Sequence, residues 1–194
     1  MSENRGMDEV LSTRALNRAT LARQLLLERD TRTPLATVEH LVGMQAQVPH
    51  NPYTGLWSRL ANFRPESLSE LLERREVVRV GVMRGTIHLV TADDCLLLRP
   101  LMQPVLDAQL NRHGEHAPSL RGVDLEPIVE LARTVLEEKP RSGTELRAIF
   151  AERFPDLNAA ALTHACQICL AFVQVPPRGL WGRSAQVRST TVES

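Results

Sequence analysis

Two glutamines stand one residue apart in the stretch GMQAQVPHNPYTGLW, residues 43 to 57. In a continuing α-helix Gln45 and Gln47 would point about 200° away from each other, whereas in an extended segment they point the same way. Pro49 pushes the residue before it out of the α region, and Gly43 suits the end of a helix. We therefore expect Gln45 and Gln47 side by side on one face, with Ala46 turned into the protein.

Two adjacent carboxamides carry four N–H donors and two carbonyl acceptors, and they have no charge at any pH. Such a pair can position a water molecule or bind the edge of a base, but it cannot act as a strong general base. The alternative is that Gln45 and Gln47 are solvated polar residues that close a helix.

A second group of candidates lies in MRGTIHLV, which we expect to form a hairpin that breaks at Arg84-Gly85. Arg84, Thr86 and His88 on such a ribbon are suited to contact with the minor groove of DNA. The structural alternative is that Arg-Gly forms only a turn, and that His88 merely alternates with Ile87 and Leu89 along a strand.

A third group lies in the stretch 174–192, which contains no acidic residue. Basic residues interleaved with an aromatic suit contact with phosphates. The alternative is an ordinary solvated ribbon. The candidates for DNA contact in this stretch are Arg178, Trp181, Arg183 and Arg188.

The sequence THACQIC places His164, Cys166 and Cys169 on one expected helix. A structural zinc site needs four converging ligands, and only Cys95 or a distant histidine is left to complete it. We therefore expect the cysteines to pack as small apolar residues, with no metal site. Three cysteines in the chain are too few for a disulfide framework, which fits a reducing compartment.

The surrounding elements repeat in order. The first half shows helical patterns and caps followed by a β-branched ribbon, which is the layout of a winged helix-turn-helix module with the ribbon as the wing. We expect helices over 12–29, 33–43, 53–62 and 65–75, and a hairpin over 77–91.

The second half has the same order, so we predict a mainly α chain with short β-hairpins (α+β), built from tandem winged-helix modules. The modules span 1–112 and 113–194, with the boundary near 112–123. We expect a connecting helix over 92–112, interrupted near Pro100 and Pro104, a loop over 111–124, helices over 124–138, 142–154 and 158–172, and strand, turn and strand over 172–191.

Composition narrows the possible classes of protein. At 194 residues and 43% apolar content, the chain can form one large domain or two small ones with a packed core. The sequence lacks an apolar run long enough for a membrane span and a signal-like N-terminus, so we expect a cytoplasmic protein without membrane contact. Formal net charge is zero, so any binding to nucleic acid must come from local patches.

Three blocks together resemble the bacterial winged-helix DNA glycosylases that unhook interstrand crosslinks, the AlkZ and YcaQ family. The blocks are LVGMQAQVPHNPYTGLWSRL (41–60), VVRVGVMRGTIHLVTADD (77–94) and VPPRGLWGRS (175–184). In that family the catalytic motif is Gln, an apolar residue, then Gln or Asp. Gln45-Ala46-Gln47 resembles the Gln-x-Gln subgroup, which is associated with self-resistance to DNA-alkylating natural products.

The resemblance implies an enzyme that hydrolyses the N-glycosidic bond of N7-alkylated purines in double-stranded DNA, crosslinked purines included. It implies that Gln45 and Gln47 orient the hydrolytic water, without a metal or cofactor, and we expect a monomer. Family members are about twice this length, with three winged helices and a C-terminal β-barrel. We therefore expect this chain to be a truncated member or an N-terminal fragment.

Two other functions stay open at this point. One is a non-catalytic winged-helix DNA-binding protein, and the other is a chain whose modules contact other proteins. A sequence-specific regulator needs a basic recognition helix, and the expected helix over 53–62 offers only Arg59. That scarcity counts against sequence-specific binding.

Overall fold

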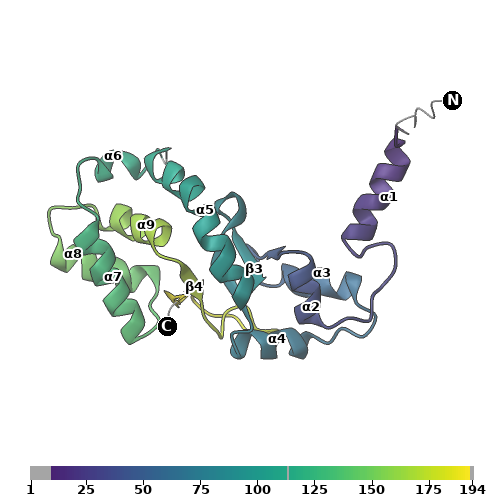
Figure 1. Ribbon diagram of the computed structural model, residues 1–194. Coiled ribbons are helices and arrows are strands. Elements are labelled where there is room, and N and C mark those ends of the chain that lie inside the picture. Colours follow the sequence, from purple (N-terminus) through teal and green to yellow (C-terminus); the bar gives the residue numbers. More distant parts are fainter. Residues whose placement is uncertain (1–9, 113, 193–194) are drawn as a thin grey trace, which may run out of the picture.

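The structure is a computed structural model that describes residues 10–112 and 114–192. It is a mixed α and β fold, as predicted (Figure 1). The first half contains α1 (Thr13–Arg23), α2 (Pro34–His40), β1 (Met44–Gln45), α3 (Asn51–Arg59), α4 (Pro65–Glu73), β2 (Val77–Gly81), the 3₁₀ turn η1 (Met83–Gly85) and β3 (Ile87–Thr91). The long helix α5 (Ala92–Arg112) leads to α6 (Ala117–Leu120), α7 (Glu126–Glu138), α8 (Gly143–Arg153), α9 (Ala159–Cys169), β4 (Phe172–Gln174) and β5 (Ser189–Thr191).

Helix starts follow the capping residues in the sequence. The predicted capping box is confirmed, because the Ser142 hydroxyl accepts from the Glu145 N–H at 3.2 Å while the Glu145 carboxylate accepts from the Ser142 N–H at 2.7 Å. Asn158 likewise accepts hydrogen bonds from two N–H groups at the start of α9. These side chains satisfy N–H groups that have no partner inside their helices.

Three expected elements differ from the structure. Helix α1 ends at Arg23, because Leu25 adopts a left-handed conformation (φ 56°) and the Leu26 N–H turns back to the Leu21 carbonyl at 2.8 Å. Helix α5 runs without interruption through Pro100 and Pro104. The expected loop over 111–124 contains the short helix α6, and residue 113 within that loop lies outside the described residues.

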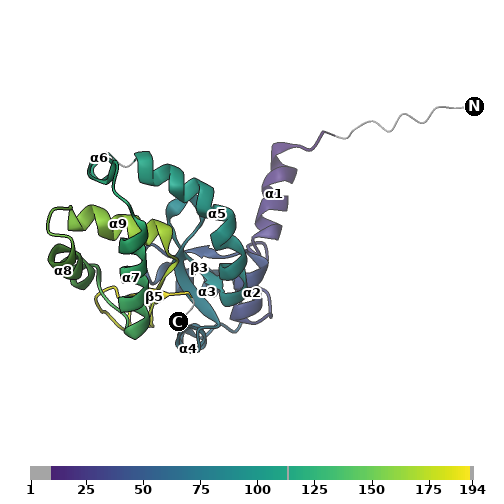
Figure 2. The same cartoon turned by 60° about the vertical axis from the view of Figure 1, so that its left-hand side comes forward.

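One antiparallel sheet runs through both halves of the chain. Its strand order is β1-β3-β2-β4-β5, so β2 of the first half pairs with β4 of the second through Arg79 opposite Gln174 and Val80 opposite Val173. Figure 2 shows the strands in the middle of the molecule, with α7, α8 and α9 to one side and α2 and α3 to the other. The module boundary near 112–123 stays a prediction.

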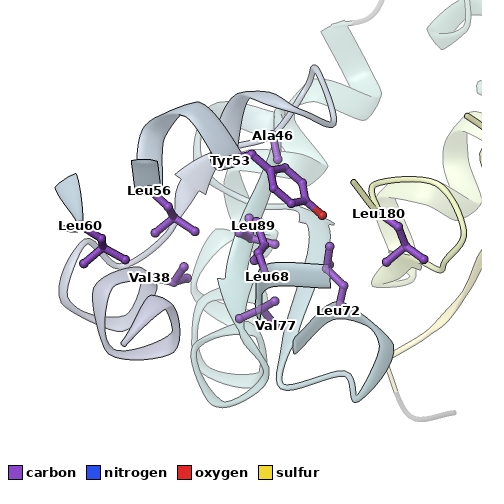
Figure 3. Close-up of a cluster of buried hydrophobic side chains, with 10 residues drawn as sticks. All are labelled: Val38, Ala46, Tyr53, Leu56, Leu60, Leu68, Leu72, Val77, Leu89 and Leu180. Atoms are coloured by element: carbon purple, nitrogen blue, oxygen red, sulfur yellow. The ribbon is translucent and has the colours of Figure 1, made fainter. Parts of the chain in front are cut away.

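The core of the first half includes a residue from the second. Figure 3 shows the cluster around Val38, Leu56 and Leu89, which Leu180 joins from the loop between β4 and β5. At the same place the Tyr53 hydroxyl donates to the Gly179 carbonyl at 2.7 Å. A second cluster, centred on Phe150, fills the space between α7, α8 and α9. The loop over 175–188 therefore packs onto the first half.

Helix α1 is set apart from the rest of the fold (Figure 1), and none of its residues is buried. Hydrogen bonds hold its C-terminal end: the Arg59 Nε donates to the Gln24 carbonyl at 2.8 Å, the Arg59 Nη2 donates to the Gln24 Oε1 at 3.4 Å, and His40 Nε2 lies 3.0 Å from the Arg23 carbonyl oxygen. Among the described helices, none is long and apolar enough to cross a membrane.

Candidate active site

The segment Gln45-Ala46-Gln47 lies beside β3: Gln45 ends strand β1, and Gln47 begins the bend that follows. Gln45 lies opposite His88 in the ladder, and the Ala46 N–H donates to the Ile87 carbonyl at 2.8 Å. Ala46 is fully buried, whereas Gln45 and Gln47 are both exposed. The predicted burial of Ala46 between two exposed glutamines is confirmed.

A tight turn after α2 brings this segment to the sheet. Val42 and Gly43 both have positive φ, 57° and 112°, and the Gly43 N–H donates to the Val38 carbonyl at 3.0 Å. A Cβ atom at residue 43 would lie 2.7 Å from the Val90 Cγ1 and 3.0 Å from the Leu89 carbonyl oxygen. Glycine is therefore required by both backbone conformation and space, which explains how Gln45 comes to lie so close to β3.

The side chain of Gln47 takes the place of a main-chain acceptor in the ladder. Its Oε1 atom accepts from the Ile87 N–H at 3.1 Å. A main-chain N–H can only donate, so this contact fixes which end of the carboxamide faces β3. The NH₂ group and the second lone pair of Oε1 are left for other partners.

Gln47 also lines a pocket of about 330 Å³ between the hairpin, α5, α9 and the β4–β5 end of the sheet. Neutral polar groups are prominent in its lining, and Gln45 does not contribute to it. No carboxylate is present among its described lining residues. The polar side chains that line the pocket are Gln47, Arg99, Gln109, His164, Gln167, Gln174 and Ser189.

A buried arginine lies behind the glutamines. Arg79, on β2, is 2% exposed, and its Nη2 donates to the Ala46 carbonyl at 2.8 Å. Burial, together with the positive charge of Arg178, lowers the pKa of Arg79 to about 10, so it stays protonated at neutral pH. Arg79 is not among the site residues predicted from the sequence. A lone arginine inside the apolar strand VVRVG is the signal that identifies it.

The hairpin candidates occupy different environments. Arg84 is exposed at the tip, in a left-handed conformation with φ 57°, and Thr86 is partly buried next to it. His88 is only 5% exposed, and its Nδ1 lies 2.9 Å from the Thr86 carbonyl oxygen. His88 therefore faces the protein interior, on the sheet face that Gln45 shares.

Trp181 brings the second half next to the glutamine segment. Its ring centroid lies 5.1 Å from that of Tyr53 and 5.9 Å from that of His50, three residues after Gln47. The indole remains 50% exposed, and Arg183 two residues later is also exposed. Trp181 thus packs on the first half of the chain, although it belongs to the second half.

The other two arginines of this stretch are bonded within the protein. Arg178 Nη1 donates to the Ala185 carbonyl at 2.8 Å, within its own loop. Arg188 donates to the Pro140 carbonyl at 2.9 Å and forms an ion pair with Glu145 at 3.1 Å. Both guanidinium groups thereby support the loop and its attachment to α8.

The cysteines lie in apolar surroundings. Cys95 and Cys166 are fully buried, and burial raises the pKa of Cys95 to about 11 and that of Cys166 to about 12. Thiols held protonated in this way pack as small apolar groups. Within residues 10–112 and 114–192, no three His, Cys, Asp or Glu side chains come together as a metal site.

Comparison with solved structures shows a similar fold. The DNA glycosylase AlkZ of Streptomyces sahachiroi matches with a TM-score of 0.59 and 22% sequence identity, over 90% of this chain and 47% of that protein. The chain thus spans about half the length of the solved relative. No curated protein matches the sequence.

The sequence profile of the DNA glycosylase AlkZ-like family matches residues 38–194. This range includes the glutamine segment, the hairpin and the loop over 175–188. On this match, the chain belongs to the AlkZ-like DNA glycosylase family.

Proposed function

We propose that this chain carries the hydrolytic centre of a DNA repair glycosylase that acts on N7-alkylated purines. The observation that carries the proposal is the Gln45-Ala46-Gln47 segment beside β3, which exposes both carboxamides and places Gln47 at a polar pocket with no carboxylate among its described lining residues. Membership of the AlkZ-like family supports the reaction class. Crosslinked purines are a further proposed substrate.

The chemistry suits uncharged amides. Alkylation at N7 makes the purine a cationic leaving group, so no protein acid has to protonate it. Water attacks C1′ as the bond from C1′ to N9 breaks, the bonding electrons return to the base and neutralise it, and the water proton passes to solvent. Carboxamide oxygens that orient this water and face the oxocarbenium-like sugar can contribute about 10²–10⁴-fold.

Contact with double-stranded DNA is proposed for four exposed or partly exposed residues on either side of the segment. These are Arg84 and Thr86 at the hairpin, and Trp181 and Arg183 in the loop over 175–188. His88, Arg178 and Arg188 would act indirectly, by holding the hairpin and the loop in shape. We further propose that the helices of the first half and the β2–β3 ribbon form a winged-helix module, that the protein acts as a monomer, and that it works inside the cell where DNA is its substrate.

The non-catalytic alternative finds less support. A regulator would use the exposed face of α3, whose arginine, Arg59, donates to the carbonyls of Gly55 and Gln24 at 2.8 Å each. That guanidinium is engaged in holding α1 and α3 together. It is poorly placed to bind base edges.

The test is single-turnover release of N7-methylguanine from duplex DNA. Gln45→Ala and Gln47→Ala should each lower the release rate by about 10²-fold, because each removes one of the groups that orient water. Gln24→Ala, at an exposed glutamine at the end of α1, is the matched control and should release the base at the unmodified rate. Equal rates in all four proteins would refute the assignment.

A further inference from the structure

We propose that Arg79 is a positioning residue for this centre: its guanidinium holds the peptide between Gln45 and Gln47 and so sets the direction of both carboxamides. The inference rests on the proposed function, which it deepens by adding a residue from another strand. Arg79 touches neither water nor substrate in this role. It acts through the main chain of Ala46.

The geometry fixes Ala46 at both of its hydrogen-bonding groups. Its N–H donates to the Ile87 carbonyl at 2.8 Å, and its carbonyl accepts from Arg79 Nη2, also at 2.8 Å. The Ala46 side chain is fully buried, so the residue cannot rotate without breaking both bonds and leaving the core. Since Gln45 and Gln47 flank this residue, their directions depend on the same two bonds.

Burial of the Arg79 guanidinium is energetically unfavourable, and its hydrogen bond to the Ala46 carbonyl satisfies only part of it. Arg79 is 2% exposed, and its Nε and Nη1 have no hydrogen-bond partner within the described residues. No described carboxylate forms an ion pair with it, and burial lowers its pKa. A buried guanidinium in this state is disfavoured relative to an apolar side chain of similar volume. The presence of a charged arginine in this apolar strand therefore indicates a role other than stabilising the fold.

The surroundings of Arg79 connect the segment to the second half. Gly179, with φ 99°, passes so close that a Cβ atom there would lie 3.2 Å from Arg79 Cδ. Gln174 lies directly opposite Arg79 on β4, and it also lines the pocket that Gln47 lines. Side chains at opposed positions share one face of a sheet, so Arg79 lies between the glutamine segment and the β4 side of the pocket.

The experiment compares three variants with the unmodified 194-residue chain. Arg79→Met keeps the volume and removes the hydrogen bond, Arg79→Lys keeps the charge, and Arg141→Met is the matched control. Arg141 also donates from a largely buried guanidinium to a main-chain carbonyl, that of Val135 at 2.9 Å, but in the second half. Three quantities are measured: the single-turnover release rate at saturating protein, the Kd for duplex DNA, and amide hydrogen exchange over residues 44–48.

Arg79→Met should lower the release rate by about 10- to 100-fold, since displacement of a positioned group by about 1 Å has effects of that size. In Arg79→Met the Kd for duplex DNA should change little, and amide exchange at Ala46 and Gln47 should become faster. The release rate and the exchange rates of Arg79→Lys should lie between those of Arg79→Met and those of the unmodified chain. Arg141→Met should leave rate and exchange over 44–48 unchanged. If Arg79→Met does not fold, Arg79→Lys carries the same comparison.

Two results would overturn the inference. One is unchanged exchange over 44–48 in both Arg79 variants, which decides the matter whether or not the chain releases bases. The other is an unchanged release rate in Arg79→Met while Gln47→Ala is slow. Absence of release from the unmodified chain would instead count against the proposed function, and the exchange measurement would still decide whether Arg79 holds the segment.

Discussion

Gln47 makes two kinds of contact that a single alanine substitution removes together. Its Oε1 atom closes the ladder by accepting from the Ile87 N–H, while the rest of the carboxamide faces the pocket. Loss of base release in Gln47→Ala could therefore follow from a displaced hairpin as well as from a lost water ligand. Substitutions that keep or remove the acceptor separate the two effects.

Gln47→Glu should stay as stable as the unmodified chain, because a carboxylate oxygen still accepts from Ile87. It should also keep releasing N7-methylguanine, since a carboxylate orients water and faces a cationic sugar at least as well as an amide. Gln47→Leu should lose release and about 0.5–1.5 kcal/mol of unfolding free energy, the typical net value of one hydrogen bond. Urea denaturation and single-turnover release measure the two quantities. Equal activity in the two variants would mean that the acceptor oxygen has no catalytic role.

Among single residues, those governed by their chain neighbours were predictable from sequence. Gly43 and Pro49 bracket the glutamines, so burial of Ala46 and exposure of Gln45 and Gln47 followed from local geometry. The environments of Arg79 and Arg188 were not predictable in this way. Their partners are Ala46 and Glu145, which lie 33 and 43 residues away in the chain.

The start of helix α8 is stabilised by the carboxylate of Glu145. Hydrogen bonds from the Ser142 main chain and hydroxyl, with a smaller contribution from Arg188, lower the pKa of Glu145 from its ordinary 4.5 to about 2. A carboxyl group with a lowered pKa in the folded state stabilises that state while it is ionised. Its contribution is fully present above about pH 4.5 and is lost as the pH falls toward 2.

Thermal unfolding followed between pH 6 and about pH 2 should therefore show a fall in Tm that is smaller in Glu145→Gln than in the unmodified chain. At neutral pH, Glu145→Gln should have the lower Tm, because the amide loses the charge that Arg188 and the helix N-terminus favour. Glu152→Gln, at an exposed position on the same helix, is the control. Identical pH profiles for Glu145→Gln and the unmodified chain would contradict this account.

Elements with strong local signals formed where the sequence predicted them. The caps at Ser142 and Asn158 fixed the starts of α8 and α9, and Pro34 and Pro65 each opened a helix. The continuity of α5 through two prolines was not predicted. A proline inside a helix loses one hydrogen bond, and packing of that helix against β2, β3 and α9 offsets the loss here.

The whole molecule is joined by contacts that no local pattern reveals. The repeated order of helices and ribbon suggested two modules in tandem, but pairing between β2 and β4 makes their ribbons one sheet. Leu180 enters the core of the first half, and Tyr53 bonds to Gly179. Strand partners this far apart in the chain are set by tertiary packing, so sequence periodicity predicts the strands but not their neighbours.

A shared sheet and an inserted loop predict that the two halves unfold together. The fluorescence of Trp181 reports the contact between the halves, since its ring packs on Tyr53 and His50. Far-UV circular dichroism reports the helices of the whole chain, including α7, α8 and α9 of the second half. In a Trp57→Phe background Trp181 is the remaining tryptophan. Urea transitions by fluorescence and by circular dichroism should then coincide.

Leu180→Ala tests the same coupling by weakening it. The side chain is 9% exposed within the first core, and its truncation should cost about 2–3 kcal/mol of unfolding free energy. If the halves form one cooperative unit, both transitions shift to lower urea by the same amount, because the loss is shared by the whole fold. A fluorescence transition that moves alone would mean that the loop detaches while the second half stays folded, and Arg79 would then lose its packing against Gly179 before the protein unfolds.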